Sequence, residues 1–256
     1  MKRFLMTGLV TLLMTSPALG GSVEQARSLF HKGNYEAAQI TAMALDSQDA
    51  QLLAAEIKGA RIMLMDVEDA KDTAKAALKI VEDILDEDPD NTEALFLQAM
   101  HQGFRTRSSS AFSIIMGGMI GDTKDDIEAF AAAAPGDPRA DALLGAWHLG
   151  IVRAAGDGRF GASLTEGIAA YDRAVAAMPE DIPTLANYAF SLIVMEEPEL
   201  IPRAKELLVQ LETIKPTDAF TTETKARMMR LLAVIDQPEV MQETARGLLN
   251  TEEVEG

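Results

Sequence analysis

The chain has 256 residues, of which 48% are hydrophobic and 25% charged, with a formal net charge of −17 and no cysteine. This charge argues against a nucleic acid or an anionic membrane surface as partner, because binding to phosphates depends on clustered Lys and Arg side chains, and the densest basic cluster is only Arg105 with Arg107. Without cysteine there is no disulfide bond, and a chain of this length can bury a continuous core without one. We interpret the charge as a source of solubility; an acidic face for a basic partner is the alternative.

Residues 1–20 have the layout of a cleaved secretory signal. Lys2 and Arg3 form a basic start, residues 4–14 are mostly apolar, and the segment ends in small residues up to Gly20. The apolar stretch is too short to span a bilayer, although an uncleaved anchor is the alternative, and no cysteine follows it for lipid attachment. We expect cleavage after Gly20 or Gly21 and a periplasmic or secreted location in a Gram-negative bacterium. The mature chain is then expected not to insert into a membrane, and losing Lys2 and Arg3 takes its formal charge from −17 to −19.

The remaining sequence predicts an all-α domain over residues 21–250 and a flexible acidic tail over 251–256. Apolar residues recur with helical spacing between turn signals along this domain. We expect about twelve helices in five or six hairpins, over residues 22–32, 35–46, 49–64, 68–87, 92–102, 122–133, 137–154, 162–177, 182–195, 198–213, 219–234 and 237–249.

Four prolines indicate that these hairpins form a repeat. Pro89, Pro135, Pro179 and Pro216 each close a predicted helix, because proline disfavours helical continuation, and they are separated by 46, 44 and 37 residues. Small and apolar residues recur at the same offsets before each proline. A fixed pattern at such a period is typical of a helical array in which each hairpin buries its apolar face against the next.

The pattern resembles the tetratricopeptide repeat (TPR). The resemblance is carried by the first half of one unit, the second half of another and the close-packing positions of later units, namely Ala26, Leu29, Gly33, Tyr35, Ala38, Tyr171, Ala174, Pro179, Gly145, Ala189 and Ala226. It implies a right-handed α-solenoid of TPR-like helical hairpins whose concave groove, lined by the first helix of each repeat, binds a protein or peptide. On that basis the expected groove residues are Gln98, Gln102, His148, Asn187 and Ser191. Asn187 would hydrogen-bond an extended peptide, or else is simply an exposed polar residue.

Two segments depart from the repeat and are candidate contact surfaces. Residues 104–120 pass from a polar, Ser-rich stretch to an apolar, Gly-rich one that contains Met116 and Met119. This segment is either a lengthened, buried helix or an apolar lip of the groove, where methionine would offer an adaptable surface. Residues 155–163 hold three glycines together with Arg159 and Phe160, and a long insert of this kind often lies on a binding rim.

No catalytic motif is present, and no enzyme activity, cofactor or metal is expected. His31, His101 and His148 stand alone on separate predicted helices, whereas nucleophilic or metal chemistry needs several converging groups. His148, beside Trp147, is expected to pack at a hairpin interface if it does not face the groove. The acidic turn around Pro89 lacks the spacing of a calcium loop.

The function expected from these features is that of an exported, non-catalytic scaffold that binds a protein or peptide partner. The alternative belongs to another class: some periplasmic TPR-like proteins are accessory subunits of tripartite (TRAP-type) solute transporters and hold a small organic ligand between helices. The absence of a cysteine for lipid anchoring counts against this alternative. Neither the partner nor the oligomeric state follows from the sequence.

Overall fold

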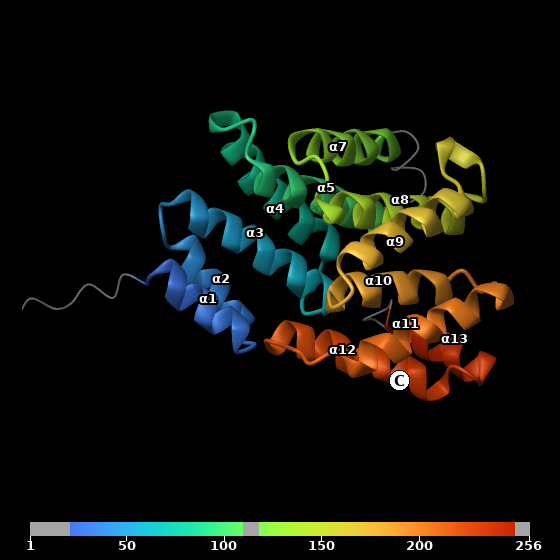
Figure 1. Cartoon of the computed structure of the whole chain (residues 1–256). Coiled ribbons are helices and arrows are strands. Elements are labelled where there is room, and N and C mark those ends of the chain that lie inside the picture. Colours follow the sequence, from blue (N-terminus) through green and yellow to red (C-terminus); the bar gives the residue numbers. More distant parts are fainter. Residues whose placement is uncertain (1–20, 110–117, 249–256) are drawn as a thin grey trace, which may run out of the picture.

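A computed structural model describes residues 21–109 and 118–248, and this part of the chain is helical with no β-strand (Figure 1). The predicted signal segment, Met116 and the acidic tail lie outside the described residues. The twelve described α-helices are α1 (Val23–His31), α2 (Tyr35–Met43), α3 (Gln48–Met63), α4 (Ala70–Glu87), α5 (Thr92–Arg107), α7 (Met119–Ala133), α8 (Pro138–Ala155), α9 (Leu164–Ala177), α10 (Ile182–Ile193), α11 (Ile201–Thr213), α12 (Ala219–Val234) and α13 (Pro238–Gly247). Two short 3₁₀ turns, η1 (Arg159–Gly161) and η2 (Pro198–Leu200), complete the described elements.

The all-α prediction and the helix number are confirmed, and the helix ends follow local chemistry. Each of the four prolines lies two or three residues beyond the end of a helix, since α4, α7, α9 and α11 end before them. Asparagine or aspartate then caps the next helix. The Asn91 carboxamide accepts from the Ala94 amide at 3.0 Å and the Asp181 carboxylate accepts from the Thr184 amide at 2.9 Å.

Several predicted boundaries are wrong: α2 ends at Met43 rather than residue 46, α7 begins at Met119 rather than 122, and α11 begins at Ile201 rather than 198. Two further differences follow local chemistry. Helix α4 begins at Ala70 rather than residue 68, because the Asp69 carboxylate accepts from the Asp72 amide at 2.8 Å and so acts as the N-cap. Helix α5 continues to Arg107 instead of ending at Gln102. Its last turn carries two arginines, which suit the negative end of the helix dipole, so the predicted break after Gln102 begins a full turn later.

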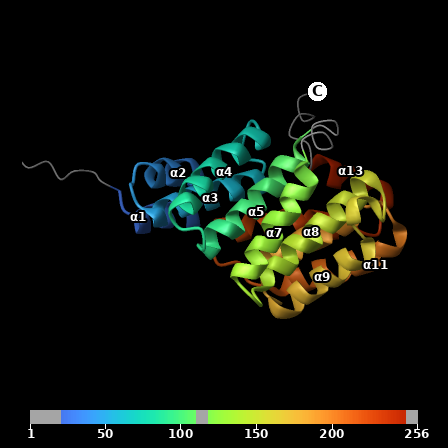
Figure 2. The same ribbon diagram turned by 90° about the horizontal axis from the view of Figure 1, so that it is seen from above.

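The helices form two layers. Each helix packs on its neighbours in the chain, and alternate helices also touch one another: α1 contacts α3, α3 contacts α5, α5 contacts α8, α8 contacts α10, and α10 contacts α12. These six form an inner layer, and α2, α4, α7, α9, α11 and α13 lie outside them. Figure 2, seen from above, follows the succession from α1 at one end to α9 and α11 at the other.

The two ends of the inner layer meet. Helix α1 contacts α12 as well as α3, so the inner helices form a closed cycle of contacts (Figure 1). We call this contact the seam. The Phe30 and Phe220 rings stack across it with centroids 6.3 Å apart, and the Tyr35 hydroxyl donates to Glu223 Oε1 at 3.0 Å. Arg227 of α12 also donates to the Leu64 carbonyl, just beyond the end of α3.

The largest buried cluster joins helices α8 to α13. At its centre the Tyr171 and Tyr188 rings stack with centroids 4.6 Å apart and planes 6° apart. A Cβ atom at Gly145 would lie 2.5 Å from Tyr171 Cδ2, so only glycine allows α8 and α9 to cross at this distance. We call Gly145, Tyr171 and Tyr188 the tyrosine crossing. It fulfils the close-packing role that the sequence pattern assigned to Gly145.

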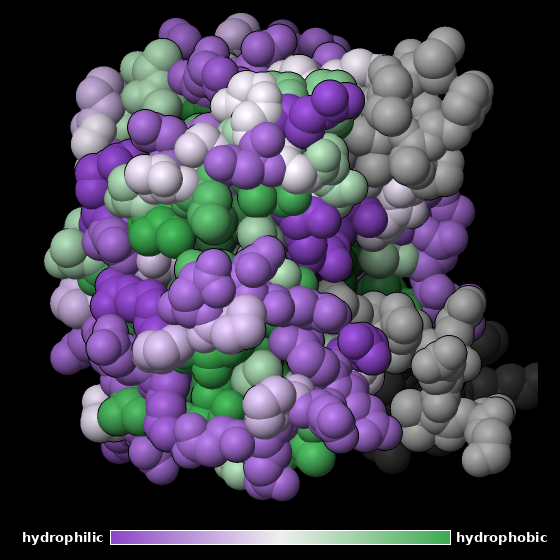
Figure 3. All heavy atoms as spheres, turned by 90° about the vertical axis from the view of Figure 1, so that its right-hand side faces the viewer, coloured by the Kyte–Doolittle hydropathy of each residue, from purple (hydrophilic) through white to green (hydrophobic). Residues whose placement is uncertain are grey.

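The side of the molecule seen in Figure 3, which is the right-hand side of Figure 1, is mostly polar outside the grey atoms, with apolar side chains visible in furrows between the polar ones. None of the helices in the described part of the chain combines the length and the apolar character that crossing a membrane requires.

Candidate functional site

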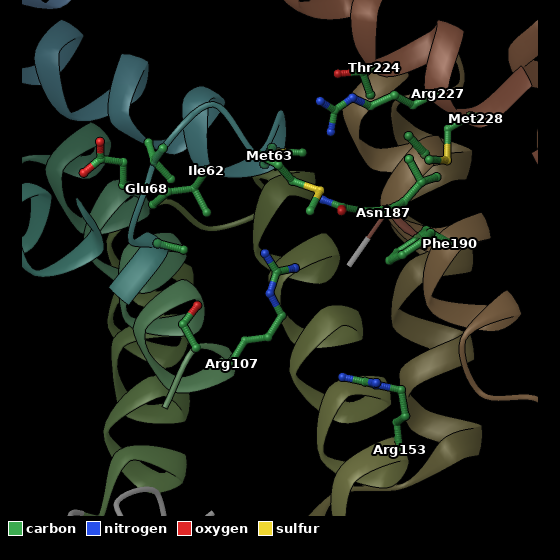
Figure 4. Close-up of a pocket in the computed structure, with 16 residues that line it drawn as sticks. Ile62, Met63, Glu68, Arg107, Arg153, Asn187, Phe190, Thr224, Arg227 and Met228 are labelled. Carbon is green, nitrogen blue, oxygen red and sulfur yellow. The ribbon is translucent and has the colours of Figure 1, made fainter. Parts of the chain in front are cut away.

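A central cavity of about 420 Å³ lies on the inner side of the helical array. Its walls come from the end of α3 and the turn that follows it, and from α5, α8, α10 and α12, so the residues that meet there are far apart in the sequence (Figure 4). The lining includes the polar Arg107, Arg153, Asn187, Thr224 and Arg227 and the apolar Ile62, Met63, Phe190 and Met228. The cavity therefore combines cationic, amide and apolar walls.

The positive charge of the cavity comes from the ends of two helices. Arg107 is the last residue of α5 and Arg153 lies in the last turn of α8, where cationic side chains suit the helix dipole. In Figure 4 both guanidinium groups point into the cavity. The surrounding protein atoms lower the pKa of Arg107, and the nearby charge of Arg153 lowers it further. Among the described residues that line the cavity, Glu68 is the only acidic one, and its side chain lies at the edge of this view.

The third arginine of the lining, Arg227, connects α12 to the end of α3. Its guanidinium donates to the Leu64 carbonyl, which satisfies an acceptor beyond the end of α3. Desolvation lowers the pKa of Arg227, and the charge of Glu223 opposes this shift. Because Glu223 also accepts from Tyr35, the seam and the cavity share the same stretch of α12. Arg227 thus links the closure of the array to the shape of the cavity.

Two further polar groups and an apolar surface complete the lining. Asn187 is exposed to the cavity from α10, and Thr224 of α12 is buried. The Thr224 hydroxyl has no hydrogen-bond partner among the described residues, which is uncommon for a buried polar atom. Phe190, Met63 and Met228 supply apolar surface near these groups. The arrangement can orient a molecule through a few polar contacts while its remaining surface packs on apolar side chains.

Of the predicted groove residues, only Asn187 lines the cavity. All five lie on inner helices, but Gln98 and Ser191 are half-buried, and Gln102 and His148 are buried. Gln102 Oε1 accepts from Arg105 Nη1 at 3.3 Å, and His148 Nδ1 accepts from the Ser163 amide at 3.1 Å. His148 therefore packs at the α8–α9 hairpin, as the alternative reading of the sequence predicted, and does not face the cavity.

The residues predicted in the two inserts lie elsewhere. Met119 is buried as the first residue of α7, so it belongs to the core rather than to an exposed lip, while Met116 lies outside the described residues. Arg159 and Phe160 are exposed in the loop between α8 and α9, and 48% of Phe160 is accessible to solvent. Neither lines the cavity. This loop is a separate surface, stabilised by its own bonds, such as Asp157 Oδ1 accepting from the Leu164 amide at 2.8 Å.

The described part of the chain contains no group of His, Cys, Asp or Glu side chains arranged to hold a metal ion. His101 is fully buried, and Nε2 lies 2.9 Å from the Ala55 carbonyl oxygen. Burial lowers its pKa to about 4, so the ring is neutral at pH 7. No acid or nucleophile accompanies it, and its position between α3 and α5 is that of a core residue.

The cationic residues of the cavity were missed by reasoning from the sequence. Arg105 and Arg107 stand out as the densest basic cluster, but Arg153 and Arg227 carry no local signal. Their proximity depends on how the inner helices come together, which no short motif specifies. A comparison with protein-family models finds no match, and a comparison with curated proteins finds none either.

Proposed function

We propose that this chain is an exported, non-catalytic binding protein that holds its ligand in the central cavity. The observation that carries this proposal is the cavity itself, to which five inner helices or their adjoining turns contribute side chains. Small-molecule sites typically have volumes of roughly 300–1,000 Å³, mostly apolar walls and a few polar groups that orient the ligand. The cavity, at about 420 Å³, has this size, and its walls combine apolar side chains with charged and amide ones.

The array is proposed to be a right-handed α-solenoid of TPR-like hairpins. Support comes from the two layers of helices, from the prolines just beyond four helix ends and from Gly145 at the tyrosine crossing. In such an array the inner helices present the binding surface, and here they line the cavity. The predicted export signal adds a periplasmic or secreted location to the proposal.

The seam argues for a smaller ligand than the protein or peptide partner that the resemblance implies. Because α1 contacts α12, the inner surface is closed at this edge and the space left is that of a small molecule or a few peptide residues. The same observation favours the second candidate function, an accessory subunit of a tripartite solute transporter with a small organic ligand between its helices. Both functions place the ligand in the same cavity.

A substitution that fills the cavity tests this proposal. In Asn187→Trp the indole would project from α10 into the space, whereas Val209→Trp places the same ring on the exposed outer side of α11. Signal-processed wild-type protein and both variants are isolated from periplasmic extract, and bound molecules are identified by native mass spectrometry and by pull-down. We expect a specific small molecule with the wild type and Val209→Trp, and its loss with Asn187→Trp.

Two results would contradict the proposal. If all three proteins retain the same molecule, the ligand lies outside the cavity. If no small molecule is retained and a protein partner is recovered equally well with Asn187→Trp, the chain is a scaffold that binds through another surface.

A further inference from the structure

Six of the twelve arginines in the described part of the chain form ion pairs and six do not, and the second six include Arg105, Arg159 and Arg230, which do not line the central cavity. Arg27 lies 3.6 Å from Glu56 Oε2, and Arg61, Arg139, Arg173, Arg203 and Arg246 each lie within 3.2 Å of a carboxylate oxygen. None of the ion pairs between described residues includes Arg107, Arg153 or Arg227. In a chain with 40 acidic and 23 basic residues, carboxylates are the more abundant partner, yet among the described residues that line the cavity Glu68 is the only acidic one.

This arrangement has an electrostatic cost in the empty protein. Arg107 and Arg153 carry like charges into one partly enclosed space, and although both residues are exposed to solvent, the surrounding atoms and the charge of Arg153 lower the pKa of Arg107. Arg227 offsets its own desolvation by donating to the Leu64 carbonyl. Within the described ranges Arg107 lies over the face of Phe104, 5.3 Å from its guanidinium carbon, and neither Arg107 nor Arg153 has a hydrogen-bond acceptor there. An anion between Arg107 and Arg153 would remove the repulsion and supply the missing acceptors.

The rest of the lining limits what such an anion can be. The same cavity is lined by Asn187, by Thr224, whose hydroxyl is unpartnered among the described residues and lies beside Arg227, and by Phe190, Met63 and Met228. Inorganic phosphate would leave the apolar walls uncovered, and a neutral sugar would leave the positive charge of the two guanidinium groups uncompensated. A molecule with one acid group and an apolar body satisfies both parts of the cavity.

We propose that the central cavity is a site for a small organic anion, whose carboxylate or phosphate head lies between Arg107 and Arg153 and whose apolar body packs on Phe190, Met63 and Met228. The proposal rests on the proposed function and specifies the chemical class of its ligand. Guanidinium groups suit this head because their planar forks donate two parallel hydrogen bonds to a carboxylate or phosphate. Asn187 and Thr224 can hydrogen-bond the polar end of the same molecule.

The competing explanation is that both arginines only stabilise helix ends. Arg107 and Arg153 lie in the last turns of α5 and α8, where a cation typically contributes about 0.3–1 kcal/mol through the helix dipole. The two explanations differ for the empty protein. If the arginines serve the helices, neutralising them lowers stability; if they serve a ligand, neutralising one relieves repulsion, and stability is unchanged or rises.

The test uses three probes that share one apolar body: octanoate, octyl phosphate and the neutral octanamide. Each is titrated calorimetrically into signal-processed protein that has been unfolded, freed of bound molecules and refolded. We expect octanoate or octyl phosphate to bind at least tenfold more tightly than octanamide, and the ratio between the two anions identifies the preferred head. Equal binding of all three, abolished by Asn187→Trp, would overturn the anion inference and leave the proposed function standing. Failure of both anions to bind at millimolar concentration would also overturn the inference, and the molecule retained by the wild type would then decide the function separately.

Charge-neutralising variants assign the head site. Arg107→Gln and Arg153→Gln should each weaken binding of the preferred anion by about tenfold or more, since a hydrogen bond to a charged group typically contributes this much. Arg107→Lys should fall between these variants and the wild type. Arg230→Gln removes the same charge from an exposed position on α12 outside the cavity and should leave affinity unchanged. If Arg107→Gln and Arg153→Gln leave the affinity unchanged and lower the stability of the empty protein, the arginines stabilise helix ends and do not bind the anion.

Discussion

The tyrosine crossing and the seam are both aromatic contacts between helices, but they differ in construction. At the crossing Tyr171 and Tyr188 are almost completely buried and stack 4.6 Å apart against a glycine. At the seam the Phe30 and Phe220 rings are 6.3 Å apart, Phe220 is half-buried, and the hydrogen bond from Tyr35 to Glu223 lies partly in solvent. The crossing joins helices that are adjacent in the chain, whereas the seam joins its two ends.

This difference separates two roles. Dense apolar packing between neighbouring hairpins fixes the fold, because each methylene buried there contributes to stability. A contact that is small, polar and distant in sequence adds little to global stability, but it determines whether the inner layer is closed around the cavity. We therefore expect substitutions at crossings to unfold the protein and substitutions at the seam to change access to the cavity.

The largest expected effect is at the tyrosine crossing. Tyr171→Ala should lower the free energy of unfolding by about 3–5 kcal/mol, since a fully buried aromatic side chain would be replaced by a void. Phe220→Ala at the seam should cost less than half as much, because its ring is already partly exposed. Urea denaturation followed by circular dichroism measures both values. Equal losses would mean that the seam is part of the cooperative core.

The next effect is acid sensitivity at the crossing of α3 and α5. Burial lowers the pKa of His101 to about 4, below its usual 6.5, so the unfolded chain binds a proton that the folded protein does not. The contribution of His101 is therefore present above pH 6.5 and is lost as the pH falls toward 4. We expect this contribution to lower the free energy of unfolding by about 2 kcal/mol between pH 7 and pH 5.

His101→Gln serves as the comparison, because glutamine can still donate to the Ala55 carbonyl and does not titrate. Denaturation of both proteins at pH 7 and pH 5 separates this contribution from the carboxylates, which are common to both. If the wild type and the variant lose the same stability on acidification, the proposed burial of a neutral His101 is wrong.

Two glycines of α8 should respond to alanine substitution with smaller changes in stability, and these two changes should have opposite signs. In Gly145→Ala the new Cβ would meet Tyr171 at about 2.5 Å, and we expect a net loss of about 1–2 kcal/mol after the gain in helix propensity. In Gly150→Ala the new Cβ has no other atom within 4 Å, and we expect a gain of up to about 1 kcal/mol. Thermal denaturation ranks the two variants. A gain in both would show that the crossing can widen without cost.

The smallest expected change in stability comes from the seam hydrogen bond. Tyr35→Phe removes the donor to Glu223 and should cost about 0.5–1 kcal/mol, since the acceptor is exposed. Separation of α1 from α12 at the seam is measured as the distance between two labels attached to cysteines introduced at Lys32 and Thr222. Both positions are exposed, one on each side of the seam, and the chain has no native cysteine that would also be labelled. We expect this distance distribution to broaden.

Tyr188→Phe is the matched control, because it removes a hydrogen bond of the same kind, from Tyr188 to Asp172 Oδ1 at 2.9 Å, at a position away from the seam. It should leave the label distance unchanged. Broadening in both variants, or in neither, would contradict the assignment of the Tyr35–Glu223 bond to closure.

The features of the fold that could be predicted are those encoded locally. Helix ends follow from prolines and from capping side chains such as Asn91 and Asp181, which act within a few residues of themselves. The end of α5 was predicted too early because the polar run after Gln102 was interpreted as a loop, although its arginines suit the last turn of a helix. The seam could not be predicted, since Tyr35 and Glu223 are 188 residues apart and no pattern in either segment refers to the other.

For the site, too, locally encoded features could be predicted and features that depend on distant residues could not. The resemblance placed the binding residues on inner helices, and this identified Asn187, which lines the cavity. It also selected Gln102 and His148, whose helical spacing is equally suitable but whose side chains point into the hairpin packing. Helical spacing specifies the face of a helix to within about one residue, so it cannot separate cavity from core. The convergence of Arg107 and Arg153 depends on the arrangement of whole helices.

The contact between α1 and α12 also restricts how this array can vary in length. In an open repeat array a hairpin can be inserted or deleted at the cost of one interface, because each unit touches only its neighbours. Here Phe30 and Phe220 meet only if the intervening helices turn through the right angle. An added hairpin would carry the two ends past each other, and a missing one would leave them apart, so the number of units is fixed by the geometry of closure.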